Sequence, residues 1–201
     1  MGGRGSSYNK NASKNFIDFT ESSISSDDFF GVKDGDNAKW IESLNKKQKE
    51  SLVGYTVEDY RSINKYLRGE SEGNDSIKEK IKNIQNAISS SPLKSGIVVH
   101  RYDNGGFLGI KSIYDIDQKK IGEVIESKGF LSTSTKRTIG FGYIGYDIKL
   151  PKGFNQGQFI KKLSFYESEN EFLINHKQKF KITGFSKDNY GTTIVQLEYI
   201  K

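Results

Sequence analysis

The chain contains no cysteine, and this absence removes several kinds of chemistry at once. With no thiol among its 201 residues, it can form no disulfide, no thiolate metal site and no cysteine nucleophile. Histidine is almost as scarce, because His100 and His176 are the only two and lie far apart in the sequence. We therefore expect no metal centre built on histidine.

Long apolar runs are missing as well. No stretch approaches the roughly 20 consecutive apolar residues of a membrane-spanning helix, and the N-terminus lacks the apolar core of a signal peptide. We therefore expect no membrane span. Hydrophobic residues make up 34% of the chain and charged residues 28%, which is typical of a protein with a polar surface.

Aromatic and basic residues are plentiful. Eleven Tyr, thirteen Phe and one Trp make up 12% of the sequence and can supply core volume. The net charge is +6, but the lysines are spread along the chain instead of forming a basic patch. We therefore expect no nucleic-acid partner.

Composition divides the chain near residue 15. Residues 1–15 are rich in Gly, Ser, Asn and Lys, which predicts a flexible N-terminal segment. Apolar residues begin at Phe16, and we expect residues 16–201 to form one domain with a sizeable core.

The first half of this domain is predicted to be helical, because its apolar residues recur at helical spacing. Asp36 is placed to cap a helix, Asn45 with Gln48 resembles a capping box, and so does Thr56 with Asp59. The apolar stripes are formed by Trp40, Ile41 and Leu44, by Leu52 and Tyr55, by Tyr60, Ile63 and Leu67, and by Ile77, Ile81, Ile84 and Ile88.

The second half is rich in β-branched and aromatic residues and predicts mostly antiparallel strands, so the fold class is α+β. A Gly-rich loop is expected at Asn104–Gly109 and a hairpin turn at Asp188–Gly191. The expected strands lie at 97–99, 129–134, 143–150, 158–160, 171–174, 180–185 and 192–200, with one further helix at 116–125.

Three polar elements follow one another in the second half: Arg101, Ser132–Ser134, and the pair Glu169 and Glu171. In a strand, residues two apart face the same side, so both carboxylates are expected to point into one cavity. Close like charges suit a site that stabilises a cationic transition state or holds a cationic acceptor. Alone, such a pair also fits a solvated acidic turn before an edge strand.

Together and in this order, the three elements resemble the catalytic domain of the bacterial mono-ADP-ribosyltransferase toxins of the arginine-serine-glutamate type. The chain is similar to the actin-modifying binary toxin enzymes and the Rho-modifying exoenzymes over about residues 36–200. Its segments Trp40–Leu44, Gly54–Thr56 and Ile63–Arg68 resemble the N-terminal helices of that family. The resemblance implies N-terminal helices packed on two mostly antiparallel β-sheets that form an NAD cleft.

The resemblance implies an enzyme that transfers ADP-ribose from NAD to a protein side chain, with some NAD glycohydrolase activity and no metal. The ribose–nicotinamide bond breaks through an oxocarbenium-like transition state, which a fixed carboxylate stabilises. Family position assigns this role to Glu171, with Ser132 orienting it and with Thr133 and Ser134 supporting the strand and the nicotinamide pocket.

The remaining NAD contacts are also implied by family position. Arg68 and Arg101 match the residues that hold the pyrophosphate, which suits the bidentate fork of a guanidinium. Asn64 matches a residue near the nucleotide, and Phe141 matches an aromatic that stacks on nicotinamide. Many relatives carry an Arg three residues beyond that aromatic, where this chain has Ile144.

Glu169 bears on the acceptor. In the family, Glu at this position goes with arginine acceptors and Gln with asparagine acceptors, and a carboxylate pairs well with a guanidinium. Glu167 and Glu169 form a second possible pair, but the apolar run Phe172–Ile174 follows Glu171 as in the family. Tyr166 then matches an exposed aromatic that contacts the protein substrate.

The setting stays open. The resemblance implies a monomeric toxin or effector, secreted or delivered into a target cell, that acts on a protein such as actin or a small GTPase. One alternative is a catalytic domain of a longer phage or secreted protein with a non-actin target. Another is a catalytically dead relative that only binds, although the intact Arg, Ser and Glu set favours an enzyme.

Overall fold

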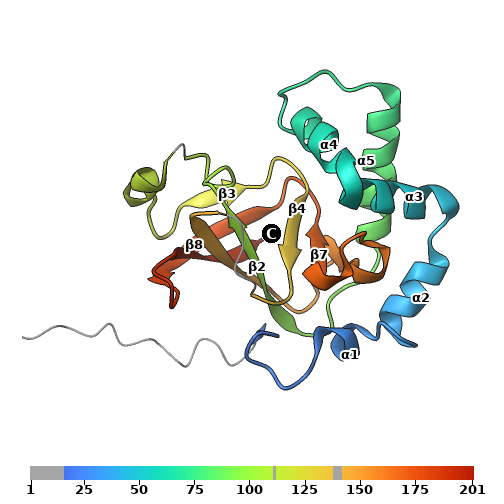
Figure 1. Cartoon of the computed structure of the whole chain (residues 1–201), viewed down its shortest axis with the longest axis horizontal. Coiled ribbons are helices and arrows are strands. Elements are labelled where there is room, and N and C mark those ends of the chain that lie inside the picture. The colour runs from blue at the N-terminus through green and yellow to red at the C-terminus, as the bar shows by residue number, and fades with distance from the viewer. Residues whose placement is uncertain (1–15, 111, 138–141) are drawn as a thin grey trace, which may run out of the picture.

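The computed structural model describes residues 16–110, 112–137 and 142–201. Helices occupy the first half and strands the second, which confirms the predicted α+β class (Figure 1). The expected flexible segment at residues 1–15 lies outside the described residues, and so does Phe141. No helix in the described part of the chain is long and apolar enough to cross a membrane.

The helices gather beside one end of the sheet, next to β4 and β7 (Figure 1). The helical elements are α1 (Ser26–Phe30), α2 (Asp36–Ser43), α3 (Lys46–Gly54), a π-helical turn (Tyr55–Asp59), α4 (Tyr60–Leu67) and α5 (Asp75–Ile88). The apolar stripes of α2 to α5 pack into one cluster, which includes Trp40, Leu52, Tyr55, Ile63, Ile84 and Ile88 and also receives Phe130 and Leu173 from the strand half. Phe30 of α1 belongs instead to the cluster built on the sheet.

Helix boundaries agree with the sequence signals only in part. The capping box of Asn45 and Gln48 is confirmed. Asp36 is the first residue of α2 instead of its cap, because Gly35 holds the capping position. The second capping box is wrong, because α3, the π-helical turn and α4 run on without a break and Thr56 bonds elsewhere.

Within the described part of the chain, the strands form a single nine-stranded sheet in the order β3-β8-β9-β5-β2-β4-β7-β6, with β1 beside β2. This corrects the expectation of two sheets, although among the described residues β2 and β4 are paired at only one position, His100 opposite Ser134. The strands are β1 (Phe16–Ile17), β2 (Gly96–Asp103), β3 (Val124–Glu126), β4 (Leu131–Ser134), β5 (Ile144–Leu150), β6 (Gly157–Phe159), β7 (Glu171–Ile174), β8 (Lys179–Lys187) and β9 (Thr193–Ile200).

The expected helix at 116–125 is wrong. Ile113–Gln118 forms a short 3-10 helix, and Val124–Glu126 becomes β3, paired with β8. Gly122 lies between them at φ +93°, a conformation that ends a right-handed helix, and its N–H donates to Ile182 O at 2.8 Å. In β3, Ile125 is buried while Val124 and Glu126 are exposed, which is the alternation of a strand and not of a helix.

Candidate active site

Glu171 begins β7 and is only 4% exposed. Ser132 on β4 donates its hydroxyl to Glu171 Oε1 at 2.6 Å, and Ser164 donates to Oε2 at 3.4 Å. Ser134, not Ser132, lies directly opposite Glu171, so the Ser132 contact is diagonal across the two strands. Both oxygens of one buried carboxylate are thus held by hydroxyl groups from two different segments.

The environment of this carboxylate favours its neutral form. Burial raises the pKa of Glu171 to about 7, and the charge of Glu169 acts in the same direction. The hydroxyls of Ser132 and Ser164 and the guanidinium of Arg101 oppose this shift of the pKa. A cation arriving beside Glu171 would favour the ionised form, so the site is suited to a positively charged reacting group.

The free energy of unfolding should therefore fall as the pH rises from about 4.5 to about 7, because the unfolded carboxyl ionises near the lower value and the folded one near the higher. Glu171→Gln removes this dependence. Relative to the wild type, the free energy of unfolding of the variant should rise by about 3 kcal/mol between about pH 4 and about pH 8. Chemical denaturation of both proteins without NAD measures the difference, and a difference that stays constant with pH would contradict the shifted pKa.

Arg101 approaches the same serine from β2. Its Nη1 donates to the backbone oxygen of Ser132 at 2.8 Å, and its Nε donates to Asp103 Oδ2 at 3.4 Å. Ser132 therefore contacts Arg101 through its carbonyl and Glu171 through its hydroxyl. The structure brings together the Arg, the Ser and the second Glu that the sequence singled out.

Asp103 was not among the residues selected from sequence. Its carboxylate accepts hydrogen bonds from Gly105 N at 2.7 Å, Phe107 N at 3.2 Å and Tyr146 Oη at 2.7 Å. It therefore holds the start of the Gly-rich loop while it contacts Arg101. The signal was present, because an Asp followed by Asn-Gly-Gly is typical of a turn in which the side chain bonds the backbone.

A cleft of about 760 Å³ opens beside Arg101. It is lined by Asn64 and Arg68 from the helical half, by the Gly-rich loop and by residues 123–131. Arg68 lies partly exposed and pairs with Glu70 at 2.6 Å. Two guanidinium groups in one cleft fit the pyrophosphate of a dinucleotide, and the volume is in the range of small-molecule sites.

Asn64 joins the helical half to the strand half. Its amide nitrogen donates to Tyr55 Oη at 3.1 Å and to Phe130 O at 3.3 Å, and its oxygen accepts from Phe130 N at 2.9 Å. Tyr55, which sequence reasoning placed only in the core, is buried, and burial raises its pKa. Asn64 thus fixes the cleft wall just before β4.

Thr133 and Ser134 bond toward β7 and the turn before it. Thr133 is buried and donates to Phe172 O at 2.5 Å, so it joins β4 to β7. Ser134 donates to Glu169 O at 2.7 Å and so holds the turn that precedes β7. Both support Glu171 through the backbone.

Glu169 does not lie on a strand. It ends the 3-10 turn Glu167–Glu169, and Asn170 follows in the left-handed conformation at φ 48°. The expectation that Glu169 and Glu171 share one strand face is therefore wrong, because Asn170 breaks the alternation and leaves Glu169 exposed. Their charges still interact, since Glu169 raises the pKa of Glu171.

Tyr166 lies in the same turn and is 50% exposed. Its ring packs edge-on against Phe165, which is 66% exposed, with the ring centroids 5.0 Å apart. Phe165 was missed from sequence because an aromatic in a turn has no periodic pattern. The turn thus presents two aromatic rings and the carboxylate of Glu169 to solvent.

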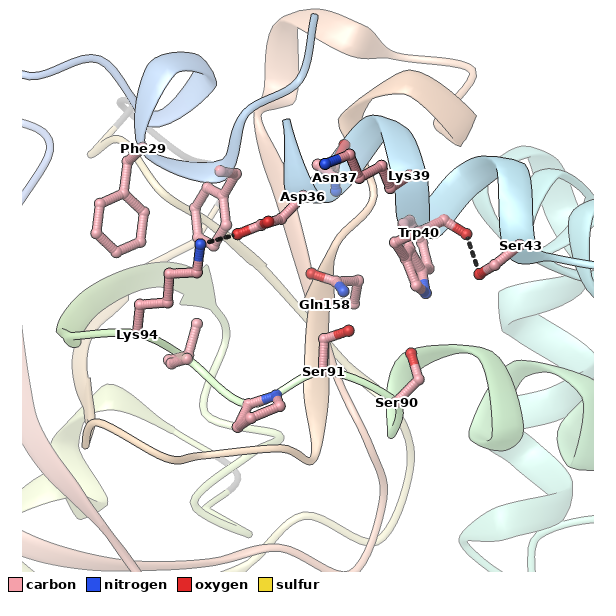
Figure 2. Close-up of a pocket in the computed structure, with 13 residues that line it drawn as sticks. Phe29, Asp36, Asn37, Lys39, Trp40, Ser43, Ser90, Ser91, Lys94 and Gln158 are labelled. Carbon is pink, nitrogen blue, oxygen red and sulfur yellow. Dashed lines mark hydrogen bonds and ion pairs between the residues drawn. The ribbon is translucent and has the colours of Figure 1, made fainter. Parts of the chain in front are cut away.

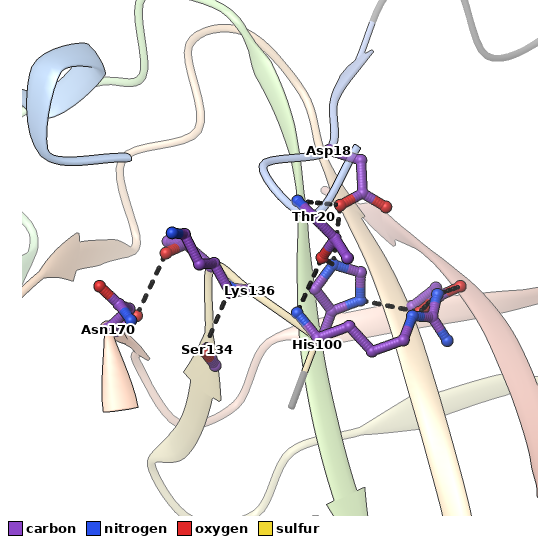
Figure 3. A network of polar contacts seen from close by, with 9 residues as sticks. Asp18, Thr20, His100, Ser134, Lys136 and Asn170 are labelled. Carbon is purple, nitrogen blue, oxygen red and sulfur yellow. Dashed lines mark hydrogen bonds and ion pairs between the residues drawn. The ribbon is translucent and has the colours of Figure 1, made fainter. Parts of the chain in front are cut away.

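Arg137 does not replace the Arg that relatives carry at the position of Ile144. It pairs with both oxygens of Asp147 on β5 at 2.7 and 2.6 Å. Asp147 also bonds His100, whose other nitrogen bonds Asp18 at 3.1 Å (Figure 3). His100 and Arg101 are neighbours on β2 and so point to opposite faces of the sheet, which places this network away from the cleft.

A second cavity of about 570 Å³ lies between α2 and the segment after α5 (Figure 2). Trp40, Gln158 and the ion pair of Asp36 with Lys94 line it. It shares no lining residue with the cleft beside Arg101. In the described ranges 16–110, 112–137 and 142–201, no group of three or more His, Asp or Glu side chains is arranged to hold a metal ion.

A family model, a named relative and solved structures all match this chain. The model of the ADP-ribosyltransferase exoenzyme family matches residues 30–199. The chain is 30% identical over 191 residues to NAD(+)--arginine ADP-ribosyltransferase EFV of Enterococcus faecalis, covering 86% of this chain and 35% of that protein. The chain therefore spans about a third of the length of that relative.

Solved structures show the same arrangement of helices and strands. The enzymatic component C2-I of the Clostridium botulinum C2 toxin is 25% identical, with a TM-score of 0.75 over 94% of this chain and 50% of that chain. The C3 exoenzyme of Clostridium limosum is 19% identical, with a TM-score of 0.78 over 93% of this chain and 98% of that chain. At that identity the second match is evidence for the fold alone.

Proposed function

Because the chain belongs to the ADP-ribosyltransferase exoenzyme family, we propose that it transfers the ADP-ribose of NAD to arginine side chains of a protein. One observation carries this proposal: Ser132 contacts the buried carboxylate of Glu171 and the guanidinium of Arg101 at once. A fixed anion for the ribose and a fixed cation for the pyrophosphate thus lie on either side of one residue.

The reaction has two parts: cleavage of the ribose–nicotinamide bond of NAD, and bonding of the acceptor to the ribose. The bond between ribose C1′ and the nicotinamide nitrogen breaks, and its electron pair leaves with neutral nicotinamide. Glu171, in its ionised form, stabilises the positive charge that develops on the ribose, and Ser132 keeps the carboxylate in place. A guanidino nitrogen of the acceptor then bonds C1′ and releases a proton to water. Water in place of the acceptor gives NAD hydrolysis.

The other predicted residues are assigned to NAD in this proposal. Arg101 and Arg68, which both line the cleft, bind the pyrophosphate, and Arg68 exchanges its partner Glu70 for phosphate oxygens. Asn64 supports the nucleotide side of the cleft through its bonds to Phe130. Ser134 and Thr133 hold the strand beside the nicotinamide, and Phe141 is assigned the stacking contact from sequence.

Glu169 and Tyr166 are assigned to the acceptor. Glu169 is exposed on a turn next to Glu171, where its carboxylate can pair with the guanidinium of an arginine. The relative EFV is named as an arginine-specific enzyme, which supports this choice of acceptor. C2-I is named as the enzymatic component of a toxin, which supports a toxin. Its delivery into a target cell and a target such as actin or a small GTPase are proposed from the sequence resemblance alone.

Labelled NAD tests the proposal. The protein is incubated with it and a cell lysate, and the modified residue in any labelled band is identified by mass spectrometry. We expect label on arginine that excess unlabelled ADP-ribose does not reduce, because the enzyme uses NAD and not free ADP-ribose. Label on asparagine would remove the role of Glu169, and neither label nor released nicotinamide would favour a relative that only binds.

A further inference from the structure

The turn that carries Tyr166 and Glu169 is fastened by hydroxyl groups that come from different parts of the chain. Ser134 on β4 donates to Glu169 O at 2.7 Å. Thr56, in the π-helical turn of the helical half, accepts from Phe165 N at 3.0 Å. The turn is therefore bonded to the sheet at its end and to the helices at its beginning.

Thr56 is well placed for such a bond. Its side chain is buried, and its hydroxyl hydrogen goes to Val53 O at 2.9 Å, so the oxygen is free to accept from Phe165. The bond spans 109 positions in sequence. It connects the turn that carries Tyr166 and Glu169 to the continuous helical segment of Asn64, which lines the cleft and bonds Tyr55.

Ser164 connects the turn to Glu171. Its hydroxyl accepts from Tyr166 N at 3.2 Å and donates to Glu171 Oε2 at 3.4 Å. Phe165, which Thr56 holds, lies between Ser164 and Tyr166. The bond from Thr56 thus fixes Phe165. The residue before it, Ser164, contacts the carboxylate of Glu171, and the residue after it, Tyr166, is assigned to the acceptor.

We propose that Thr56 is a positioning residue for the protein acceptor, which holds the turn at 164–170 in register with Glu171. This inference rests on the proposed function. Thr56 acts on Phe165 N, and Glu171 keeps its shorter bond to Ser132 at 2.6 Å without it. Transfer to an acceptor therefore depends on Thr56, whereas NAD hydrolysis does not.

Thr56→Val tests the proposal, because valine has nearly the same shape but cannot accept from Phe165 N. We expect transfer to polyarginine to fall at least about 10-fold, since misplacing a reacting partner by about 1 Å can cost about 100-fold. Release of nicotinamide without an acceptor should stay within about twofold. Thr56→Ser keeps the hydroxyl and should restore transfer.

The matched control is Ser62→Ala, which removes an exposed hydroxyl that donates to Asp59 O in the same helical segment and does not reach the turn. It should change neither rate. Thr56→Ala replaces the valine variant if thermal unfolding shows that the latter does not fold. The proposal is overturned if transfer is unchanged, or if transfer and hydrolysis fall in equal proportion. A wild type without either activity would instead contradict the proposed function.

Discussion

Glu171→Gln is expected to abolish both ADP-ribose transfer and NAD hydrolysis, lowering each rate by at least about 1,000-fold. Glutamine keeps the shape of the side chain, and its amide oxygen can still accept from Ser132. Its NH2 group replaces the oxygen that accepts from Ser164 over a long distance of 3.4 Å, so the main change is the loss of the negative charge. Both reactions pass through the same positively charged ribose, and both therefore lose its stabilisation. Initial rates of nicotinamide release, with and without an arginine acceptor, measure the two losses.

Stability provides the control for this variant. Burial raises the pKa of Glu171, so the neutral amide should be better tolerated than the ionised carboxylate above about pH 7. A loss of activity in a protein that is at least as stable as the wild type cannot come from unfolding. Hydrolysis retained to within about 10-fold would move the catalytic role away from Glu171.

Glu169→Gln should lower transfer to arginine by about 100-fold or more and leave NAD hydrolysis within a few fold. The side chain is exposed in a turn and is assigned to the guanidinium of the acceptor, which an amide cannot neutralise. Hydrolysis uses water and needs no such partner. The measurement is the ratio of transfer to hydrolysis, with agmatine as a small guanidino acceptor.

Glu167→Gln is the matched control for Glu169→Gln. Glu167 lies in the same turn, two residues earlier, and pairs with Lys162 on the surface at 2.8 Å. It should keep transfer near the wild-type rate, because an exposed ion pair contributes little. Equal losses in the two variants would show that the pair of carboxylates had been read in the wrong register.

The contact between Ser132 and Glu171 was expected from the family resemblance, because strand patterns alone do not show which strands are neighbours. The patterns do place both residues on strands, and the structure pairs these strands as β4 and β7. Ser164 was not predictable, because it lies in an irregular segment and its distance in sequence from Glu171 has no structural period. The predicted strand position of Glu169 was wrong for a similar reason, because Asn170 takes a left-handed conformation that no strand pattern predicts.

Long-range polar contacts account for the other differences. Thr56 with Asp59 has the spacing of a capping box, but the Thr56 hydroxyl accepts from Phe165 N. Phe165 is 109 positions away in the sequence, and only the folded chain brings it close to Thr56. Arg137 comes shortly before β5 in the sequence, yet its guanidinium forms an ion pair with Asp147, away from the cleft. Sequence shows which residues are chemically able to form a site, whereas the fold decides which face each of them reaches.

The single pair between β2 and β4 has a mechanical consequence. Arg101 lies on one side of this junction and Glu171 on the other, and the bond from Arg101 to Ser132 crosses it. A molecule that engages both charged groups therefore bridges the seam with the fewest paired residues among the described strands. In the proposed reaction NAD is such a molecule, so the rigidity of the sheet at this seam would itself depend on occupancy by the substrate.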